Sequence, residues 1–221
     1  MRVAIMQPYF MPYAGYFRLF AVADLFVALD CVQFPRRGWV HRNRLTDENG
    51  ELQWLTVPLK KGDRDTTRIC DLRFPENAKM VLFEQTRRFP VLQRIGETHS
   101  DLANLLFNVG NDPTEYFIST LTEMAGILGL NCPVMRSSTL NIDFRFKAQQ
   151  RIIEIARQLG ATGYVNAPGG KDLYDEASFK KAGLTLEFLP HYRGGFSSIL
   201  ERVVDDGVDP VMKEIHQNLL V

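Results

Sequence analysis

Short apolar runs separated by a helical pattern occupy the first thirty residues of the chain. Residues 2–6 and 25–29 are rich in the residue types that form buried strands. Between them, Tyr16, Leu19 and Phe20 recur at the spacing of one helix face. This order predicts a strand, a helix and a second strand.

A helix that ends near a glycine and is followed by a strand occurs three times in the second half of the chain. The helix ends read LGL, LGA and AGL at residues 128–130, 159–161 and 182–184. Each glycine suits the left-handed conformation that closes a helix. The strands expected after them are residues 133–136, 163–165 and 185–189. This alternation predicts an α/β fold with a mostly parallel, doubly wound, Rossmann-like sheet covered by helices.

Two further extended runs, residues 53–57 and 68–74, have no helical pattern between them. A polar and charged loop at residues 60–67 joins them. We therefore expect an antiparallel hairpin appended to the parallel sheet. The sequence has no linker or low-complexity segment, which predicts a single domain over residues 1–221.

The charges of the chain cancel in total but not locally. There are 26 basic and 26 acidic residues, so nothing in the net charge favours nucleic-acid binding. Residues 31–94 nevertheless carry 13 basic and 8 acidic side chains. This local excess indicates an anionic small molecule as the partner.

Apolar runs and cysteines exclude several other classes of protein. No run approaches the roughly 18 apolar residues of a membrane span, and the start has no signal-peptide pattern, so we expect a cytoplasmic protein. The three cysteines are widely spaced, with no CxxC pair and no histidines at zinc spacing. We expect no structural disulfide, no metal site and no cofactor.

Polar residues follow each predicted strand. In an open parallel sheet, ligands bind beyond the carboxyl ends of the strands. Gln7 follows the first strand, Asp30 and Gln33 follow the second, Asn166 ends a later one, and His191 follows the last. We expect Gln7, Asp30, Gln33 and Asn166 to surround a common cleft.

The densest polar signal is the segment QFPRRGWVHRNR at residues 33–44. It combines four arginines with a histidine, an asparagine and a tryptophan. Arginine suits phosphate and carboxylate oxygens, and a tryptophan offers a flat face to a sugar or base. The predicted substrate-binding residues here are Arg37, Trp39, Arg42, Asn43 and Arg44. The alternative is a solvated segment whose arginines pair with neighbouring acids.

Two loops give weaker signals. The loop QPYFMPYAG at residues 7–15 places Tyr9 and Tyr13 between a strand and a helix, either lining a pocket or sealing the edge of the sheet. The segment NAPGG at residues 166–170 lacks the spacing of a known phosphate loop. Its glycines, Gly169 and Gly170, predict either an anion-binding turn or an ordinary tight turn.

Candidate bases are few. His41 and His191 are the histidines inside polar clusters, and Asp30 is the remaining catalytic candidate. Cys31 with either histidine offers a nucleophile pair, although a cysteine beside a strand is more often buried and inert.

The motifs at residues 7–17, 23–34, 37–44, 54–58 and 164–175 resemble those of the WbqC-like family of bacterial proteins. The resemblance covers most of the chain and is most specific in the first 60 residues and around NAPGG. It implies a role among O-antigen genes, for which glycine transfer has been suggested. The resulting hypothesis is a transferase that joins an aminoacyl (possibly glycyl) or acyl group to an amino sugar or sugar nucleotide.

Two alternatives stay open from the sequence. Nucleotidyl transfer is suggested by a superficial likeness of residues 10–16 to the loop of histidine-pair nucleotidylyltransferases, in which Tyr16 stands where a histidine is needed. A non-enzymatic ligand-binding or scaffolding subunit of polysaccharide assembly would instead present a large exposed aromatic patch.

Overall fold

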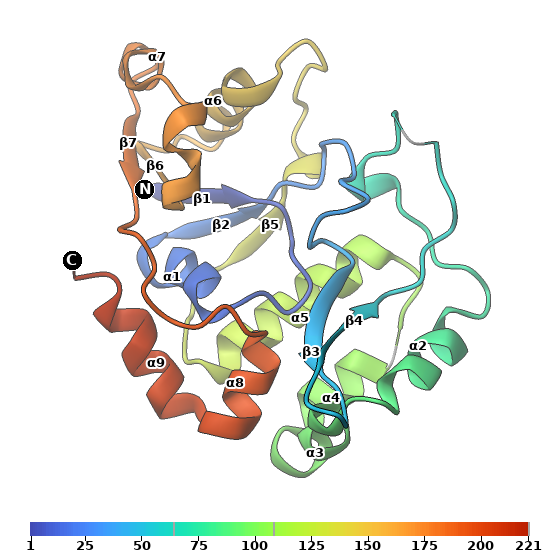
Figure 1. Ribbon diagram of the computed structural model, residues 1–221. Helices are drawn as coiled ribbons and strands as arrows, with labels where there is room; N and C mark the ends of the chain where they lie inside the picture. Colours follow the sequence, from blue (N-terminus) through green and yellow to red (C-terminus); the bar gives the residue numbers. More distant parts are fainter. Residues whose placement is uncertain (64, 108, 221) are drawn as a thin grey trace.

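The computed structural model describes residues 1–63, 65–107 and 109–220 of the chain. Five parallel strands form one sheet in the order β5-β2-β1-β6-β7 (Figure 1). These strands are β1 (Arg2–Met6), β2 (Leu25–Ala28), β5 (Val134–Arg136), β6 (Gly163–Asn166) and β7 (Thr185–Phe188). The predicted parallel, helix-covered α/β sheet is confirmed, while the single-domain organisation stays a prediction.

Helices cover both faces of the sheet, as Figure 1 shows. One face carries α6 (Ala148–Gln158) and α7 (Glu176–Lys181), and the other carries α1 (Ala14–Val22), α5 (Pro113–Ile127), α8 (Ile199–Asp206) and α9 (Val208–Gln217). An apolar core lies on each face of the sheet, and β1 contributes to both because its side chains point alternately to the two faces. Val3 packs in the cluster that contains Ile155 of α6, whereas Ala4 packs in the cluster that contains Phe17 of α1.

The strand order fixes where the sheet changes direction. From β1 the chain builds outward through β2 and β5 on one side, and later through β6 and β7 on the other. The switch point of the doubly wound sheet therefore lies between β1 and β6. Ligands of such sheets bind at this point, beyond the carboxyl ends of the strands.

The remaining helices pack beside the hairpin or lie in connections. They are η1 (Ile69–Asp71), α2 (Ala78–Thr86), α3 (Pro90–Thr98), α4 (Ser100–Phe107), η2 (Ser137–Thr139) and η3 (Pro168–Leu173). Helix α2 contacts the hairpin strand β4, and α3 contacts both α4 and α8. This helical group joins the hairpin to the core on the α5 side of the sheet.

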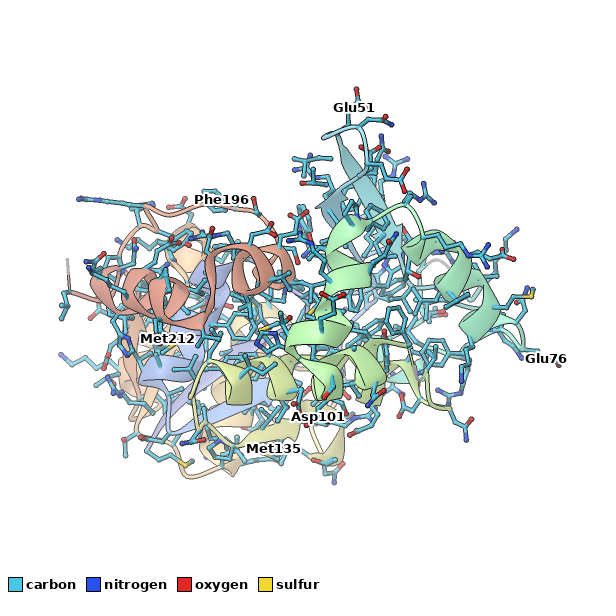
Figure 2. All side chains as sticks on the ribbon, turned by 90° about the horizontal axis from the view of Figure 1, so that it is seen from below. Glu51, Glu76, Asp101, Met135, Phe196 and Met212 are labelled. Atoms are coloured by element: carbon cyan, nitrogen blue, oxygen red, sulfur yellow. The ribbon has the colours of Figure 1, made fainter. Side chains whose placement is uncertain are left out.

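The antiparallel hairpin exists, but its strands differ from those expected. Strand β3 (Arg42–Thr46) pairs with β4 (Leu52–Thr56), so the arginine-rich segment itself forms half of the hairpin. Figure 2 shows its tip near Glu51 projecting beyond the rest of the molecule. The prediction that residues 68–74 form the second strand was wrong.

Local side-chain chemistry explains this difference. The carboxylate of Asp47 accepts hydrogen bonds from the amides of Asn49 and Glu51, and Gly50 adopts a φ of 81°, which together build a tight turn. Arg68 instead pairs with Asp71 at 2.7 Å and bends the chain into η1. Arg64, within the predicted loop at residues 60–67, lies outside the described residues.

Candidate functional site

The carboxyl ends of all five strands lie at one edge of the sheet, which faces β3 and β4 (Figure 1). Gln7 directly follows β1 and Asn166 ends β6, so both flank the switch point. Asp30 lies two residues beyond β2, and Gln33 continues the same connection. The strand ends thus share an edge as expected, and ligand binding by these four residues stays a prediction.

Asp30 is fully buried and its carboxylate is saturated with hydrogen bonds. One oxygen accepts from the Ser137 hydroxyl at 3.0 Å and the Ser138 amide at 2.7 Å. The other accepts from Arg136 Nε at 2.8 Å and the Ser138 hydroxyl at 2.7 Å. A carboxylate has about four acceptor positions. This arrangement favours a structural brace over the predicted catalytic role.

Arg136 extends that brace to a helix. Its guanidinium also pairs with Asp112 at 2.8 Å, and the Asp112 carboxylate caps the first amides of α5. Burial would lower the pKa of Arg136, but hydrogen bonds to the two carboxylates outweigh it and raise that pKa. The network therefore joins the ends of β2 and β5 to the start of α5.

His41 presents the opposite situation. Its Nδ1 is the one buried side-chain nitrogen or oxygen atom without a hydrogen-bond partner in the described part of the chain. Burial, and secondly the charge of Arg42, lower the pKa of His41 to about 4. The imidazole is consequently neutral at pH 7 and has a nitrogen that no protein group satisfies.

His41 lies in the wall of a cavity of about 270 Å³, here called the His41 cavity. The residues that carry its chemistry are Phe34, Arg36, His41, Lys60, Lys61 and Asp63. The Asp63 carboxylate accepts hydrogen bonds from Asp65 and Thr66, which lower its pKa. Neither lysine has a carboxylate within ion-pair distance among the described residues. The cavity therefore combines a net positive charge, from three basic side chains and one acidic one, with a neutral imidazole.

The predicted arginines and tryptophan form a stack on the outer face of the hairpin. Trp39 and Trp54 lie 5.3 Å apart, and they are 39% and 37% exposed. The guanidinium of Arg42 lies 4.1 Å from the Trp54 ring, and Arg44 lies 5.8 Å from the Trp39 ring. These are cation–π distances.

Arg42 is already engaged in the free protein. Its Nε donates to the carbonyl of Gly38 at 3.1 Å, and its Nη2 donates to the carbonyl of Arg37 at 2.7 Å. The Arg37 side chain, by contrast, is exposed. Of the predicted anion-binding arginines, Arg42 thus holds the loop before β3, while Arg37 and Arg44 are the exposed ones.

Asn43 acts on the loop that follows β1. It is buried, and its side-chain amide donates to the carbonyls of Phe10 and Met11. In that loop, Tyr9 packs on Tyr16 at 5.5 Å, and Tyr13 packs on Tyr192 at 5.3 Å. These contacts favour an aromatic seal of the sheet edge; substrate contact by Tyr9, Tyr13 and Asn43 stays a prediction.

The NAPGG segment is a compact turn. The Asn166 side chain accepts from the Ala167 amide at 2.8 Å, and the Gly170 amide donates to the Ala167 carbonyl at 3.0 Å. A side chain at Gly170 would collide with Asn166, which explains the glycine. Because the Gly170 amide is in use, the geometry favours the tight-turn alternative, and anion binding at Gly169 and Gly170 stays a prediction.

His191 lies far from Asp30. It is exposed and follows β7, which is three strands away from β2. At about 4.8 Å per strand, their ends are about 14 Å apart. His191 and Asp30 are therefore too distant to share a proton.

Sequence reasoning missed Arg36, Lys60 and Lys61 as site residues. The available signal was the local excess of basic residues over residues 31–94, which includes all three. They were missed because the hairpin was predicted with the wrong second strand. In the structure β3 pairs with β4, so the segment after β4 returns beside His41, and the Val57 amide donates to the His41 carbonyl at 2.8 Å.

Two other features are absent from the described residues. None of their helices is long and apolar enough to cross a membrane. They contain no group of three or more histidine, cysteine or acidic side chains placed to hold a metal ion.

Comparison with known proteins identifies the family of this chain. The family model described as the WbqC-like protein family matches residues 7–195. The uncharacterized protein Rv1507c of Mycobacterium tuberculosis (strain ATCC 25618 / H37Rv) is 26% identical over 232 residues, covering 94% of this chain and 95% of the relative. No solved structure matches the chain.

Proposed function

Because the chain belongs to the WbqC-like protein family, we propose that it is a transferase of O-antigen or other surface-polysaccharide biosynthesis. It joins an aminoacyl group, possibly glycyl, or an acyl group to an amino sugar or sugar nucleotide. The observation that supports this proposal most is His41, which lines a cationic cavity and whose buried Nδ1 has no hydrogen-bond partner among the described residues.

The His41 cavity suits the charged part of such an acceptor. Arg36, Lys60 and Lys61 line it and attract phosphate or carboxylate oxygens. Phe34 and Leu72 add apolar walls, which strengthen these interactions by excluding water. With a volume of about 270 Å³, the cavity holds the phosphorylated or sugar portion of the substrate.

In the proposed reaction, His41 acts as the base. The acceptor amine attacks the carbonyl carbon of the activated donor, a nitrogen–carbon bond forms, and the bond to the leaving group breaks with its electron pair. The neutral imidazole takes the proton that the amine loses and returns it to the leaving group. An anionic substrate beside His41 raises the pKa of this residue from its low value, which makes it a stronger base in the complex.

The test is a calorimetric titration of the protein with a UDP-linked amino sugar. The double variant Lys60→Ala/Lys61→Ala should bind it at least tenfold more weakly, since charged hydrogen bonds are worth about 1.5 to 3 kcal/mol. Lys79→Ala is the matched control, because Lys79 is an exposed lysine on α2 outside the cavity. Equal affinity of the double variant and the wild type would contradict the proposal.

The exposed Trp39 and Trp54 support a second candidate function. A pair of partly exposed tryptophans is the feature expected of a non-enzymatic ligand-binding or scaffolding subunit. Binding of glycan fragments that is lost in Trp54→Ala, without any turnover of aminoacyl or acyl donors, would favour this candidate over the transferase.

A further inference from the structure

A second and larger hollow lies on the α6 side of the sheet. It has a volume of about 570 Å³, and we call it the α6 hollow. The lining residues used below are Cys31, Phe144, Lys147, Arg151, Leu173 and Tyr174. Cys31 follows β2, and Tyr174 lies on the segment after β6. Since β2 and β6 flank β1 in the sheet, the hollow spans the switch point of the doubly wound fold.

The polar wall of the α6 hollow is cationic. Lys147, directly before α6, and Arg151, in the first turns of α6, both line the hollow. No aspartate or glutamate lines the hollow, and neither cation forms an ion pair with a described carboxylate. Arg151 donates only weakly, to the Cys31 sulfur at 3.4 Å and to the Phe144 carbonyl at 3.5 Å.

The helix start adds to this wall. Lys147 precedes α6 without a side-chain cap, and Ala148 and Gln149, which carry its first amides, also line the hollow. Amides at a helix start attract anions, and here they lie beside two basic side chains.

Three other lining residues are apolar or aromatic, and two of them are largely exposed. Phe144 is 82% exposed and Leu173 is 70% exposed at the hollow, and Tyr174 contributes a second aromatic ring. Here they gather in one hollow beside two basic side chains, and an exposed apolar patch with a polar rim is typical of a ligand-binding site. A flat, apolar ring system with an anionic group attached would cover Phe144 and neutralise Lys147 and Arg151 at the same time.

We infer that the α6 hollow binds a nucleoside phosphate, with the base against Phe144 and Tyr174 and the phosphate at Lys147 and Arg151. This inference goes beyond the proposed transfer reaction, because it concerns a different cavity from the one around His41. The two cavities are close in the chain: Gln33 lines the α6 hollow, and Phe34 lines the His41 cavity.

Calorimetry on the intact protein tests the ligand class. AMP or UMP should bind with one-to-one stoichiometry, and adenosine and inorganic phosphate should each bind at least tenfold more weakly, because each offers only half of the contacts. The inference is overturned if neither nucleotide binds at millimolar concentration, or if phosphate alone binds as tightly as the nucleotides.

Variants then locate the site. Phe144→Ala should weaken nucleotide binding about tenfold, the usual scale for base stacking, without lowering the melting temperature. Lys147→Ala/Arg151→Ala should weaken it at least tenfold, while Lys180→Ala on α7 should leave it unchanged. If Lys60→Ala/Lys61→Ala abolishes nucleotide binding and the hollow variants do not, the ligand belongs to the His41 cavity and the inference fails while the proposed function stands.

The cysteines provide an independent readout. Cys31 lines the α6 hollow and is 9% exposed, whereas Cys70 is more exposed and is not among the lining residues described for the hollow. AMP or UMP should therefore slow alkylation of Cys31 by iodoacetamide at least threefold, as followed by mass spectrometry of the individual peptides. The rate at Cys70 should not change. Equal rates at Cys31 with and without a nucleotide that binds would place the ligand elsewhere and overturn the inference.

Discussion

Asp30 is fully buried and His41 is partly buried with a buried Nδ1, yet the surroundings of these two polar groups are opposite. Both oxygens of Asp30 accept two hydrogen bonds each, and a guanidinium balances its charge. Nδ1 of His41 has no hydrogen-bond partner among the described residues. The cavity that His41 lines carries a net positive charge. Both residues were catalytic candidates from the sequence.

This difference distinguishes a residue that stabilises the fold from one that can act on a substrate. A buried polar group that is fully satisfied stabilises the fold and has no capacity left for a substrate. A buried polar atom without a partner costs free energy in the free protein, and a ligand that satisfies it recovers that free energy. We therefore propose a bracing role for Asp30 and substrate chemistry for His41.

The largest expected effect is on stability, at Asp30. Asp30→Asn removes the charge opposite Arg136 and two of the acceptor positions, so it should lower the free energy of unfolding by about 3 to 5 kcal/mol. Urea unfolding followed by circular dichroism measures this loss. The control is Asp112→Ala, which removes the partly exposed partner and a helix cap and should cost about 1 to 2 kcal/mol.

An Asp30→Asn protein with wild-type stability and no activity would reverse the assignment. In that case the carboxylate would act on the substrate, and the network with Ser137, Ser138 and Arg136 would be a means of holding a catalytic group.

The next effect is on turnover, at His41. His41→Gln should lower kcat about a hundredfold, because general-base catalysis contributes about that much. The acid limb of kcat/KM should lie near pH 4, the pKa of His41 in the free protein, rather than near the ordinary value of an imidazole. The limb of kcat should lie at higher pH, since a bound anion favours the imidazolium.

His191→Gln serves as the control for that experiment. His191 is exposed at the end of β7, so its replacement should leave both kcat and the pH profile unchanged. If His191→Gln removes the acid limb and His41→Gln does not, the proton acceptor is His191 and the His41 cavity is only a binding site.

Much of the fold could be predicted from the sequence because its signals are local. The buried strands of the sheet are continuous apolar runs, and the glycines at 129, 160 and 183 adopt the positive φ expected at helix ends. The hairpin partner could not be found by the same means. Pairing of Arg42 with Thr56 joins a highly charged strand to a partly polar one, and the deciding signal was the turn at Asp47–Gly50.

The candidate site was only partly predictable, for a different reason. The sequence identifies residue types near strand ends, but it does not show which of them are saturated by neighbours. Ser137 and Ser138 donate hydrogen bonds to Asp30 although they are more than a hundred residues away in the sequence. Lys60 lines the His41 cavity because the hairpin returns the chain there. These pairings depend on long-range topology, which residue patterns do not contain.

A smaller effect should separate Arg42 from Arg44 on the tryptophan stack. Arg42→Ala loses two hydrogen bonds to loop carbonyls and a cation–π contact, so it should lower the free energy of unfolding by about 1 to 2 kcal/mol. Arg44→Ala loses only longer ring contacts and should cost less than about 0.5 kcal/mol. Equal losses would mean that Arg42 does not hold the loop.

The smallest expected effect is the pH dependence of stability that His41 adds. The imidazole binds a proton near pH 6.5 in the unfolded chain but only near pH 4 in the folded protein. Between these values the unfolded state holds more protons, so stability falls as the pH decreases from 6.5 to 4. His41→Gln should remove about 1 kcal/mol or less of the loss between pH 7 and 5.5, measured by urea unfolding at both values. The other histidines are present in both proteins and cancel in the difference. Identical pH dependence in variant and wild type would mean that the His41 ring is hydrated in solution, which would remove the contrast with Asp30.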